Sequence, residues 1–414
     1  MINRMDLFGG FALLAMVILM VISCSNPAGS VPCSVIFYDQ NQNEITEWTK
    51  TVNSGTVIKL ADQNLMLEQG LLKTDNTLAG WQISGRGKAY NGNFTVTDDV
   101  EFSPKWLEGD WTGIGSSKEL VEKITDDPAG WYFLTADISL ASYRSGWRPI
   151  GIEEGSNYTT FSFSGILEGN GSKVTGLTIK DSNQSYDDAG LFSVIDGGTV
   201  RNLSVVLAPA GIAGNNDNTG IGGITGRLDN GKIINCYVMG NITGYCGFTG
   251  GLAGEVNDSS ISNCYSTGNI SAGYDAGGIA GLVDSSNITN CYSTGIISSG
   301  RYTGGIIGKF TGTGEISGCA AINASINSDE SAGRIVGSLD GADGQIIGNN
   351  FAWDYMPASI DVAFSGDADY DGIDTLIGEF KDKSTWDVLG FDFGYDDTAP
   401  WKMPATGYPV LYWQ

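Results

Sequence analysis

The sequence has 414 residues, enough for two or three domains with substantial cores. It contains 60 glycines and only 17% charged residues, which favours many short strands and tight turns over helical bundles or a Rossmann sheet. The net charge of −25 argues against nucleic acid and anionic membrane as partners, and the lack of histidine excludes imidazole bases, Ser-His and Cys-His pairs and most catalytic zinc sites.

Residues 1–24 predict an export signal. An apolar run over 7–22 suits a signal peptide and is short for a membrane span. The string VISC at its end resembles a bacterial lipobox, in which the cysteine is lipidated and becomes the mature N-terminus. The resemblance implies lipidation at Cys24 and an exported lipoprotein at the outer membrane or cell surface. An ordinary signal peptide or a membrane anchor is the alternative, and residues 25–34 predict a short linker.

Residues 35–106 consist of short alternating segments separated by Gly and Asn turns, which predict a small mixed β domain. In order they contain a V-x-F opening, SGTVIKL, LAGW and a closing VEFSPKW. These pieces resemble the Listeria–Bacteroides repeat, the β-grasp-like module of internalin-type surface proteins. The resemblance implies a spacer or presentation module on a cell surface.

Residues 107–160 predict an N-terminal cap for the structure that follows. The string SSKELVEKI at 116–124 has a serine before a helical run and acidic residues near its start, which is typical of a helix N-terminus. A stack of strands exposes unpaired edges at its ends, so a helix here would protect one of them.

Residues 161–348 repeat themselves. Gly pairs begin at 222, 250, 277 and 304, and each unit carries an element close to I-x-N-C-Y. Three short β-prone pieces per unit and no helical period predict stacked coils of a parallel β-helix, with about 27–28 residues per coil. Equivalent residues of successive coils then lie above one another at about 4.8 Å.

The string GGLAG…SISNCYSTGNIS resembles the GLUG motif of bacterial surface proteins. The lead-in YFLTADISL and FSGILEGNGSKVTGLTI, and the ending WKMPATGYPVLYWQ, agree with the same proteins, so that the resemblance covers most of 113–414. It implies a right-handed parallel β-helix in an adhesin-like protein. Residues 349–414 break the repeat and predict an aromatic-rich cap that closes the far end of the stack.

The repeated cysteines form a column, and we expect it to point into the core as small apolar filling. Its members are Cys236, Cys264, Cys291 and Cys319. In-register side chains point the same way, which is poor disulfide geometry, so these thiols are expected to be unpaired. Cys33 and Cys246 lie outside the column and have no evident mates.

The residue before each cysteine predicts a corner of the coil. Asn235, Asn263 and Asn290 occupy this place, and Gly318 replaces them in the next coil, as suits left-handed backbone. The residue after each cysteine is then expected to point outward. An exposed row of Tyr237, Tyr265 and Tyr292 could bind sugar rings or a partner protein, and mutual stacking of the rings is the alternative.

The string SGDADYDGIDTLIGE is a candidate calcium loop. Asp367, Asp369, Asp371 and Asp374 supply alternating carboxylates around a glycine, as oxygen-rich calcium sites require. The twelfth position, where an EF-hand has a bidentate acid, is Gly378. A solvated acidic loop is the alternative, and no other cofactor is expected.

Taken together, the sequence predicts a mainly β, lipid-anchored surface protein that binds an extended glycan or protein partner, and not an enzyme. One alternative is a carbohydrate-active β-helix enzyme, a polysaccharide lyase or hydrolase, using carboxylates; another is a structural envelope component. The adjacent pairs Asp126/Asp127 and Asp187/Asp188 do not establish the facing geometry that glycoside hydrolysis needs. No cluster of basic and acidic residues is seen to recur on one face of the coils.

Overall fold

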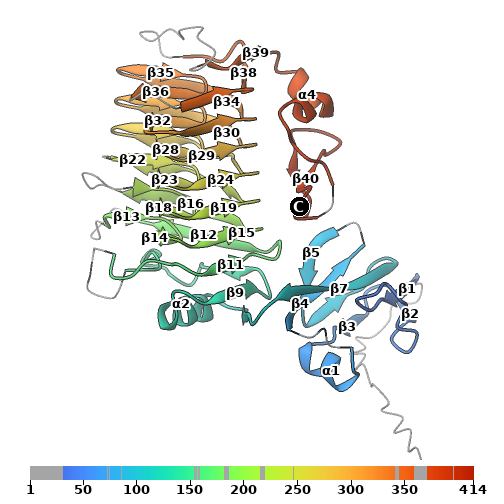
Figure 1. Cartoon of the computed structure of the whole chain (residues 1–414). Helices are drawn as coiled ribbons and strands as arrows, with labels where there is room; N and C mark the ends of the chain where they lie inside the picture. Colours follow the sequence, from blue (N-terminus) through green and yellow to red (C-terminus); the bar gives the residue numbers. More distant parts are fainter. Residues whose placement is uncertain are drawn as a thin grey trace, which may run out of the picture.

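The computed structural model describes residues 31–414 with gaps at 72, 74, 85, 153–155, 157–158, 181–185, 215–219, 246, 341–344, 359–370 and 395. Figure 1 shows a small N-terminal β domain beside one end of a tall stack of strands. A C-terminal segment runs along the side of the stack and ends near the N-terminal domain.

The N-terminal domain comprises β1 (Pro32–Phe37), β2 (Lys50–Asn53), β3 (Val57–Lys59), α1 (Gln63–Glu68), β4 (Asn76–Ile83), β5 (Arg86–Tyr90), β6 (Asn93–Thr95) and β7 (Val100–Glu108). Its main sheet has the order β2-β1-β7-β4-β5, and β3 pairs with β6. Alternate residues of β1 are buried, as the pattern predicts. Phe37 stacks on Phe102 of β7 with ring centroids 5.0 Å apart, which fixes the centre of this core.

A helix closes the near end of the stack, as the sequence predicts. α2 (Ser117–Asp126) begins after Ser116, whose hydroxyl accepts a hydrogen bond from the Glu119 amide at 3.2 Å. Leu120 and Ile124 from its inner face are fully buried in the core of the β-helix. The strand edges of the first coils are therefore covered by an amphipathic helix.

The stack is a parallel β-solenoid of about six turns, which confirms the predicted fold class. One sheet (sheet 1) contains β8 (Thr112–Ile114), β9 (Trp131–Leu134), β11 (Ile166–Glu168), β15 (Thr199–Arg201), β19 (Lys232–Ile234), β24 (Ser260–Ser262), β29 (Asn287–Thr289), β33 (Gly314–Ser317) and β37 (Gln345–Gly348).

Sheet 2 contains β10 (Ile138–Ser139), β12 (Lys173–Ile179), β16 (Ser204–Gly214), β20 (Tyr237–Met239), β21 (Ile242–Gly244), β25 (Tyr265–Ser266), β26 (Ile270–Ala272), β30 (Tyr292–Ser299), β34 (Ala320–Ser328), β38 (Phe351–Trp353) and β39 (Ile373–Thr375). Sheet 3 contains β13 (Asp188–Ala189), β17 (Gly220–Ile221), β22 (Phe248–Gly250), β27 (Asp275–Gly277), β31 (Tyr302–Gly304) and β35 (Ser331–Gly333). Sheet 4 contains β14 (Phe192–Asp196), β18 (Thr225–Asp229), β23 (Ala253–Asn257), β28 (Ala280–Asp284), β32 (Ile307–Thr311) and β36 (Val336–Asp340).

The sequence predicts three β-prone pieces per coil, and the structure adds a short strand of sheet 3 before each bend at a Gly pair. In the central coil the chain leaves β27, turns at Gly277 and Gly278, and enters β28. A side chain on Gly278 would collide with the carbonyl oxygen of Gly305, its equivalent in the next coil. The Gly pair therefore recurs because neighbouring backbones approach too closely at this bend for a Cβ atom.

The C-terminal part of the chain differs from the predicted end cap. β38 and β39 continue the stack, and then η1 (Glu379–Lys381), α4 (Lys383–Val388), β40 (Trp401–Lys402) and β41 (Val410–Leu411) lie along its flank. We call residues 379–414 the tail. Its aromatic residues cover sheet 2 and form one buried cluster with side chains of that sheet, because the outward row of sheet 2 is itself aromatic.

Candidate functional site

The corner asparagines have the backbone that the sequence predicts. Asn235, Asn263 and Asn290 have φ values of 53°, 54° and 51°, and Gly318 has a φ of 65°. Their side chains hold the tail. The Asn290 amide donates to the Gly390 carbonyl at 2.9 Å, and the Trp401 indole donates to the Asn263 side-chain oxygen at 3.3 Å. This column is therefore structural.

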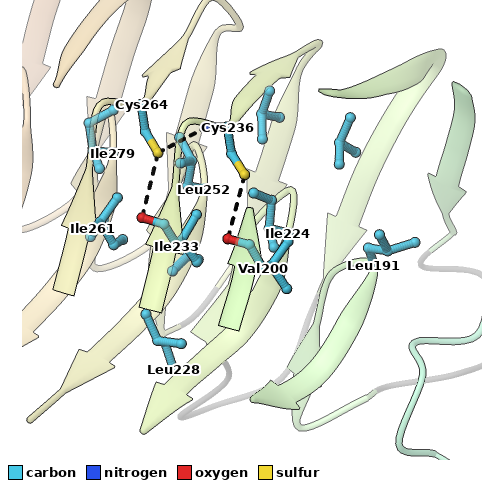
Figure 2. Packing of buried hydrophobic residues seen from close by; sticks show 14 of the residues in the cluster. Leu191, Val200, Ile224, Leu228, Ile233, Cys236, Leu252, Ile261, Cys264 and Ile279 are labelled. Atoms are coloured by element: carbon cyan, nitrogen blue, oxygen red, sulfur yellow. Dashed lines mark hydrogen bonds between the residues drawn. The ribbon is translucent and has the colours of Figure 1, made fainter. Parts of the chain in front are cut away.

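The cysteine column points into the core, as predicted. All four members are fully buried and unpaired. Figure 2 shows the thiols of Cys236 and Cys264 donating to the carbonyls of Val200 and Ile233 in the preceding coil, each at 3.7 Å, while the Cys236 amide donates to the Cys264 sulfur at 3.3 Å. Cys33 is buried in the N-terminal domain, and Cys24 and Cys246 lie outside the described residues.

The tyrosine row points away from the interior, but the prediction that it is exposed is wrong. Tyr237, Tyr265 and Tyr292 are only 2%, 4% and 2% exposed. Adjacent rings stack with centroids 5.0 and 4.7 Å apart. Trp386 and Trp401 of the tail pack against this stack. The rings therefore serve as a docking surface for the protein's own tail and are not accessible to an external ligand.

The tyrosine hydroxyls are also satisfied by the tail. Tyr292 donates to the Pro409 carbonyl at 2.6 Å, and Tyr265 donates to the side-chain oxygen of Gln414 at 2.7 Å. Burial raises the pKa of Tyr265 and raises that of Tyr292 well above its usual value. Both hydroxyls are thus neutral donors fixed in place, which suits a structural contact.

The predicted calcium ligands are only partly described. Asp367 and Asp369 lie outside the described residues. Asp371 is fully buried and accepts the Arg334 amide at 3.1 Å, and Asp374 forms an ion pair with the Arg334 guanidinium at 2.7 Å. Within the described part of the chain, no group of three acidic, cysteine or histidine residues could hold a metal ion. Calcium binding stays a prediction.

Sheets 3 and 4 carry a set of charged side chains that we call the charged face, comprising Asp188, Arg227, Glu255, Asp275, Arg301 and Lys309. Asp188 is buried and lies 3.6 Å from the Arg227 guanidinium, and the Gly220 amide donates to it at 3.3 Å. Burial raises the pKa of Asp188 to about 7; Arg227 opposes this shift and Glu255 adds to it. Burial also raises the pKa of Glu255.

Asp275 repeats this arrangement higher in the stack. It is 1% exposed and lies between Phe248 and Tyr302 in sheet 3. Burial raises its pKa to about 6, and the positive charges of Arg301 and Lys309 oppose the shift. Its carboxylate oxygens accept no hydrogen bond from the described residues, although the Tyr302 amide is close enough to favour the charged form.

These carboxyl groups can exchange protons near neutral pH, which is the property required of a general acid or base. The sequence singles out Asp188 only beside Asp187. Its pairing with Arg227 could not be predicted, because the two residues lie 39 positions apart (227 − 188) and meet only through the stacking of coils. Asp275 is not among the predicted site residues. The available signal was the register: Arg227 and Glu255 occupy equivalent places in successive coils. Of the adjacent acidic pairs considered above, Asp126 and Asp127 are exposed on the cap.

Comparisons with known proteins agree with the repeat. Residues 249–271 and 272–298 each match the GLUG motif. Over 183 residues, or 44% of the chain, the sequence is 29% identical to halomucin of Haloquadratum walsbyi (strain DSM 16790 / HBSQ001), and the match spans 2% of halomucin's length. No helix in the described residues is long and apolar enough to cross a membrane.

Two solved structures resemble the chain. The crystal structure of a candidate immunoglobulin A1 protease from Bacteroides ovatus gives a TM-score of 0.56 with 23% identity, covering 73% of this chain and 92% of that one. A second structure, described as an IgA1 protease, gives a TM-score of 0.44 with 21% identity, covering 64% of this chain and 23% of that one. At this level of identity, the first similarity shows a shared fold.

The shared fold corrects the prediction that the protein is not an enzyme. A structure with this fold is described as a candidate protease, so a GLUG-type β-helix gives no ground for excluding catalysis. The absence of histidine still restricts any catalytic chemistry of this chain to carboxylates, Tyr or Lys. The described carboxyl groups best suited to it are Asp188 and Asp275.

Proposed function

We propose that the protein is a cell-surface binding protein that holds an extended partner along the flank of its β-helix. The observation that carries this proposal is the register of the parallel strands, in which the accessible residues Ser271, Ser298 and Asn327 align in consecutive coils. A rigid flank that repeats at about 4.8 Å offers many weak contacts in line, which add up for an extended partner and not for a small molecule. The GLUG matches and the similarity to halomucin support the surface location.

Attachment tests this function directly. Beads coated with the full-length protein should retain neighbouring or host cells, and an excess of the same protein in solution should release them. Beads coated with heat-unfolded protein are the matched control. Equal retention by both kinds of bead, or retention by neither, would count against the proposal.

We also propose that Cys24 anchors the protein through a lipid. The support is the lipobox-like VISC string after an apolar run. Cys24→Ala should abolish lipid labelling and either release the protein from the membrane fraction or leave a longer precursor. Cys33→Ala is the matched control, since this second cysteine lies in β1 and should keep the label. A labelled Cys24→Ala variant would contradict the anchor.

The N-terminal domain serves in this proposal as a spacer between the anchor and the β-helix. Its resemblance to the Listeria–Bacteroides repeat supports that role. Lys105 of β7 lies 3.5 Å from the buried Glu168 of β11, so the spacer is tied to the first coils. Loss of this ion pair, for example in a Lys105→Ala variant, should loosen the spacer, which hydrogen exchange in β7 and β11 would detect.

A carbohydrate-active enzyme is the second candidate function, and the charged face favours it. Asp188 has a pKa near 7 and a guanidinium 3.6 Å away, which suits proton transfer at neutral pH. Purified full-length protein would then cleave a polysaccharide with turnover, and Asp188→Asn would abolish cleavage. Asp126→Asn, on the exposed surface of α2, is the control that should cleave normally. Absence of turnover on uronate and neutral polymers would remove this candidate.

A further inference from the structure

A polar groove of about 420 Å³ crosses three consecutive coils where β26, β30 and β34 end. Each coil contributes the last residues of one strand to its lining, which consists of Ala272 and Gly273, then Ser298, Ser299 and Gly300, then Asn327, Ser328 and Asp329. These residues are in register, since Ser299 pairs with both Ala272 and Ser328. The groove therefore runs along the stacking direction.

Two glycines line the groove at positions where the flanking coils carry side chains. Gly273 and Gly300 each follow the last residue of a strand, and Tyr245 and Asp329 hold the same place in the coils on either side. Backbone hydrogen bonds hold successive coils in register at these positions. The Gly273 amide donates to the Gly244 carbonyl at 2.8 Å, and the Gly300 amide donates to the Ala272 carbonyl at 3.2 Å. Gly273 and Gly300 therefore carry no side chain, whereas the equivalent positions in the coils on either side carry a phenol ring and a carboxylate.

The groove presents hydrogen-bonding groups that the fold does not use. The Ser298 hydroxyl and the Asp329 carboxylate have no hydrogen-bonding or ionic partner in the described part of the chain, and the Asn327 amide reaches only the Ser325 hydroxyl, at 3.3 Å. The Ser299 hydroxyl, by contrast, is held by Thr303 at 2.5 Å. Free donors and acceptors from two adjacent coils, Ser298 in one and Asn327 and Asp329 in the next, suit a ligand rich in hydroxyl groups.

Two exposed aromatic residues neighbour the groove-lining residues, Tyr245 by register in the preceding coil and Tyr274 in sequence. Tyr245 is 58% exposed, and Tyr274, which directly follows Gly273, is 48% exposed. Unlike the row beneath the tail, these rings are accessible to a partner. Arg301 beside the groove is already engaged, with its guanidinium over the Tyr302 ring at 4.6 Å and 3.7 Å from Glu330. The local charge is thus not positive, which disfavours anionic ligands.

We propose that this groove binds a neutral glycan chain, an inference that rests on the proposed binding function. The chain lies along the three coils, a span of about 10 Å at about 4.8 Å per coil. Its hydroxyl groups bond to Ser298, Asn327 and Asp329. A sugar face stacks on Tyr245 or Tyr274, since such rings offer a flat apolar surface with a polar edge.

Binding of the full-length protein to immobilised neutral polysaccharides (glucans, mannans and galactans) and to anionic uronate polymers tests the groove. The wild type should bind at least one neutral polymer and bind the uronates more weakly. The double variant Tyr245→Ala/Tyr274→Ala should bind at least tenfold more weakly with unchanged melting temperature. Ser298→Trp, which fills the groove, should do the same. Tyr355→Ala is the control: it removes a 75% exposed ring from the last coils, and this variant should bind the polysaccharides as the wild type does.

The outcomes separate this inference from the function on which it rests. Wild-type binding to neutral polymers that survives in both groove variants would overturn the groove and leave the surface-binding function standing. Cell attachment that depends on a protein receptor, without polysaccharide binding, would also overturn the groove alone. Protein that binds neither cells nor polymers would overturn both.

Discussion

At the scale of single residues, cysteine acts in this β-helix as a compact apolar side chain. Cys264 donates its thiol to the Ser262 carbonyl at 3.1 Å, and its sulfur accepts the amide of the coil below. Burial raises the pKa of the Cys264 thiol well above its usual value, so it stays protonated at neutral pH. Cys264 is therefore suited to packing in the core.

Replacing Cys264 tests this packing role. Cys264→Tyr should lower the free energy of unfolding by about 1–3 kcal/mol or more, because the fully buried site has no room for a ring. Cys264→Ala removes one sulfur and should cost only about 1 kcal/mol. Urea denaturation followed by circular dichroism measures both. If both variants unfold as the wild type does, the column contributes little to the core.

The carboxyl groups of the charged face should make stability depend on pH. Burial raises the pKa of Asp188 to about 7, so the folded protein holds a proton that the unfolded chain releases between about pH 4 and 7. Stability should therefore fall as the pH rises through this window. Asp188→Asn should flatten the dependence and gain about 1–3 kcal/mol over the wild type at pH 8, with no gain at pH 4.

Unfolding curves at several pH values supply the measurement. Asp126→Asn, an exposed carboxyl, should change neither the slope nor the stability. Parallel wild-type and Asp188→Asn profiles would contradict the prediction, because they would show that folding leaves the pKa of Asp188 unchanged. If Asp188 destabilises the folded protein near neutral pH, a role of this residue in binding or proton transfer is favoured, because functional sites often reduce stability.

At the scale of elements, the tail and sheet 2 depend on each other. Tyr265→Ser would remove a ring that stacks on its neighbours and is in contact with Trp401. We expect a loss of about 3–5 kcal/mol, as for other large buried aromatic side chains. Trypsin should then cut the tail first, at Lys381, Lys383 or Lys402. Tyr355→Ser, at an exposed ring, should leave the digestion pattern unchanged.

The repeat made some elements predictable and left others hidden. The inward side chain of Cys264 and the corner backbone of Asn263 could be predicted, because the same residues recur every 27–28 positions and occupy the same environment in each coil. The position of the tail could not be predicted, because its own sequence does not repeat and its contacts are distant: Asn290 meets Gly390 from 100 positions away. The outward direction of Tyr265 followed from alternation, but its burial depends on this distant segment. The ion pair of Asp188 with Arg227 was likewise hidden, because it joins residues of different coils.

At the scale of the whole molecule, one buried carboxylate joins the two domains. Glu168 is fully buried, accepts Arg201 at 2.8 Å and lies 3.5 Å from Lys105 of the N-terminal domain. The Glu168 carboxylate also accepts hydrogen bonds from the Asn170 backbone amide at 2.8 Å and from the Asn202 side-chain amide at 3.0 Å. The N-terminal domain is therefore fixed to the β-helix by a satisfied ionic network and not only by the chain connection.

Glu168→Ala should cost about 3–5 kcal/mol, because it leaves two cations without their buried partner. The loss should also separate the unfolding of the two domains into distinct calorimetric transitions. Glu122→Ala breaks the exposed pair with Lys118 on α2 and should change stability by less than about 1 kcal/mol. A single unchanged transition in Glu168→Ala would show that other contacts hold the domains together.

The course of the tail fixes how many coils the protein can have. Repeat proteins commonly gain or lose units by duplication or deletion, because each unit contacts only its neighbours. Here the tail starts beside Asn349 near the top of the stack and reaches Tyr412 beside Gly87 of the N-terminal domain. One inserted coil would lengthen the stack by about 4.8 Å and pull these two contacts apart. The length of the tail therefore matches the height of the stack. A change in the number of coils would have to be accompanied by a change in the length of the tail.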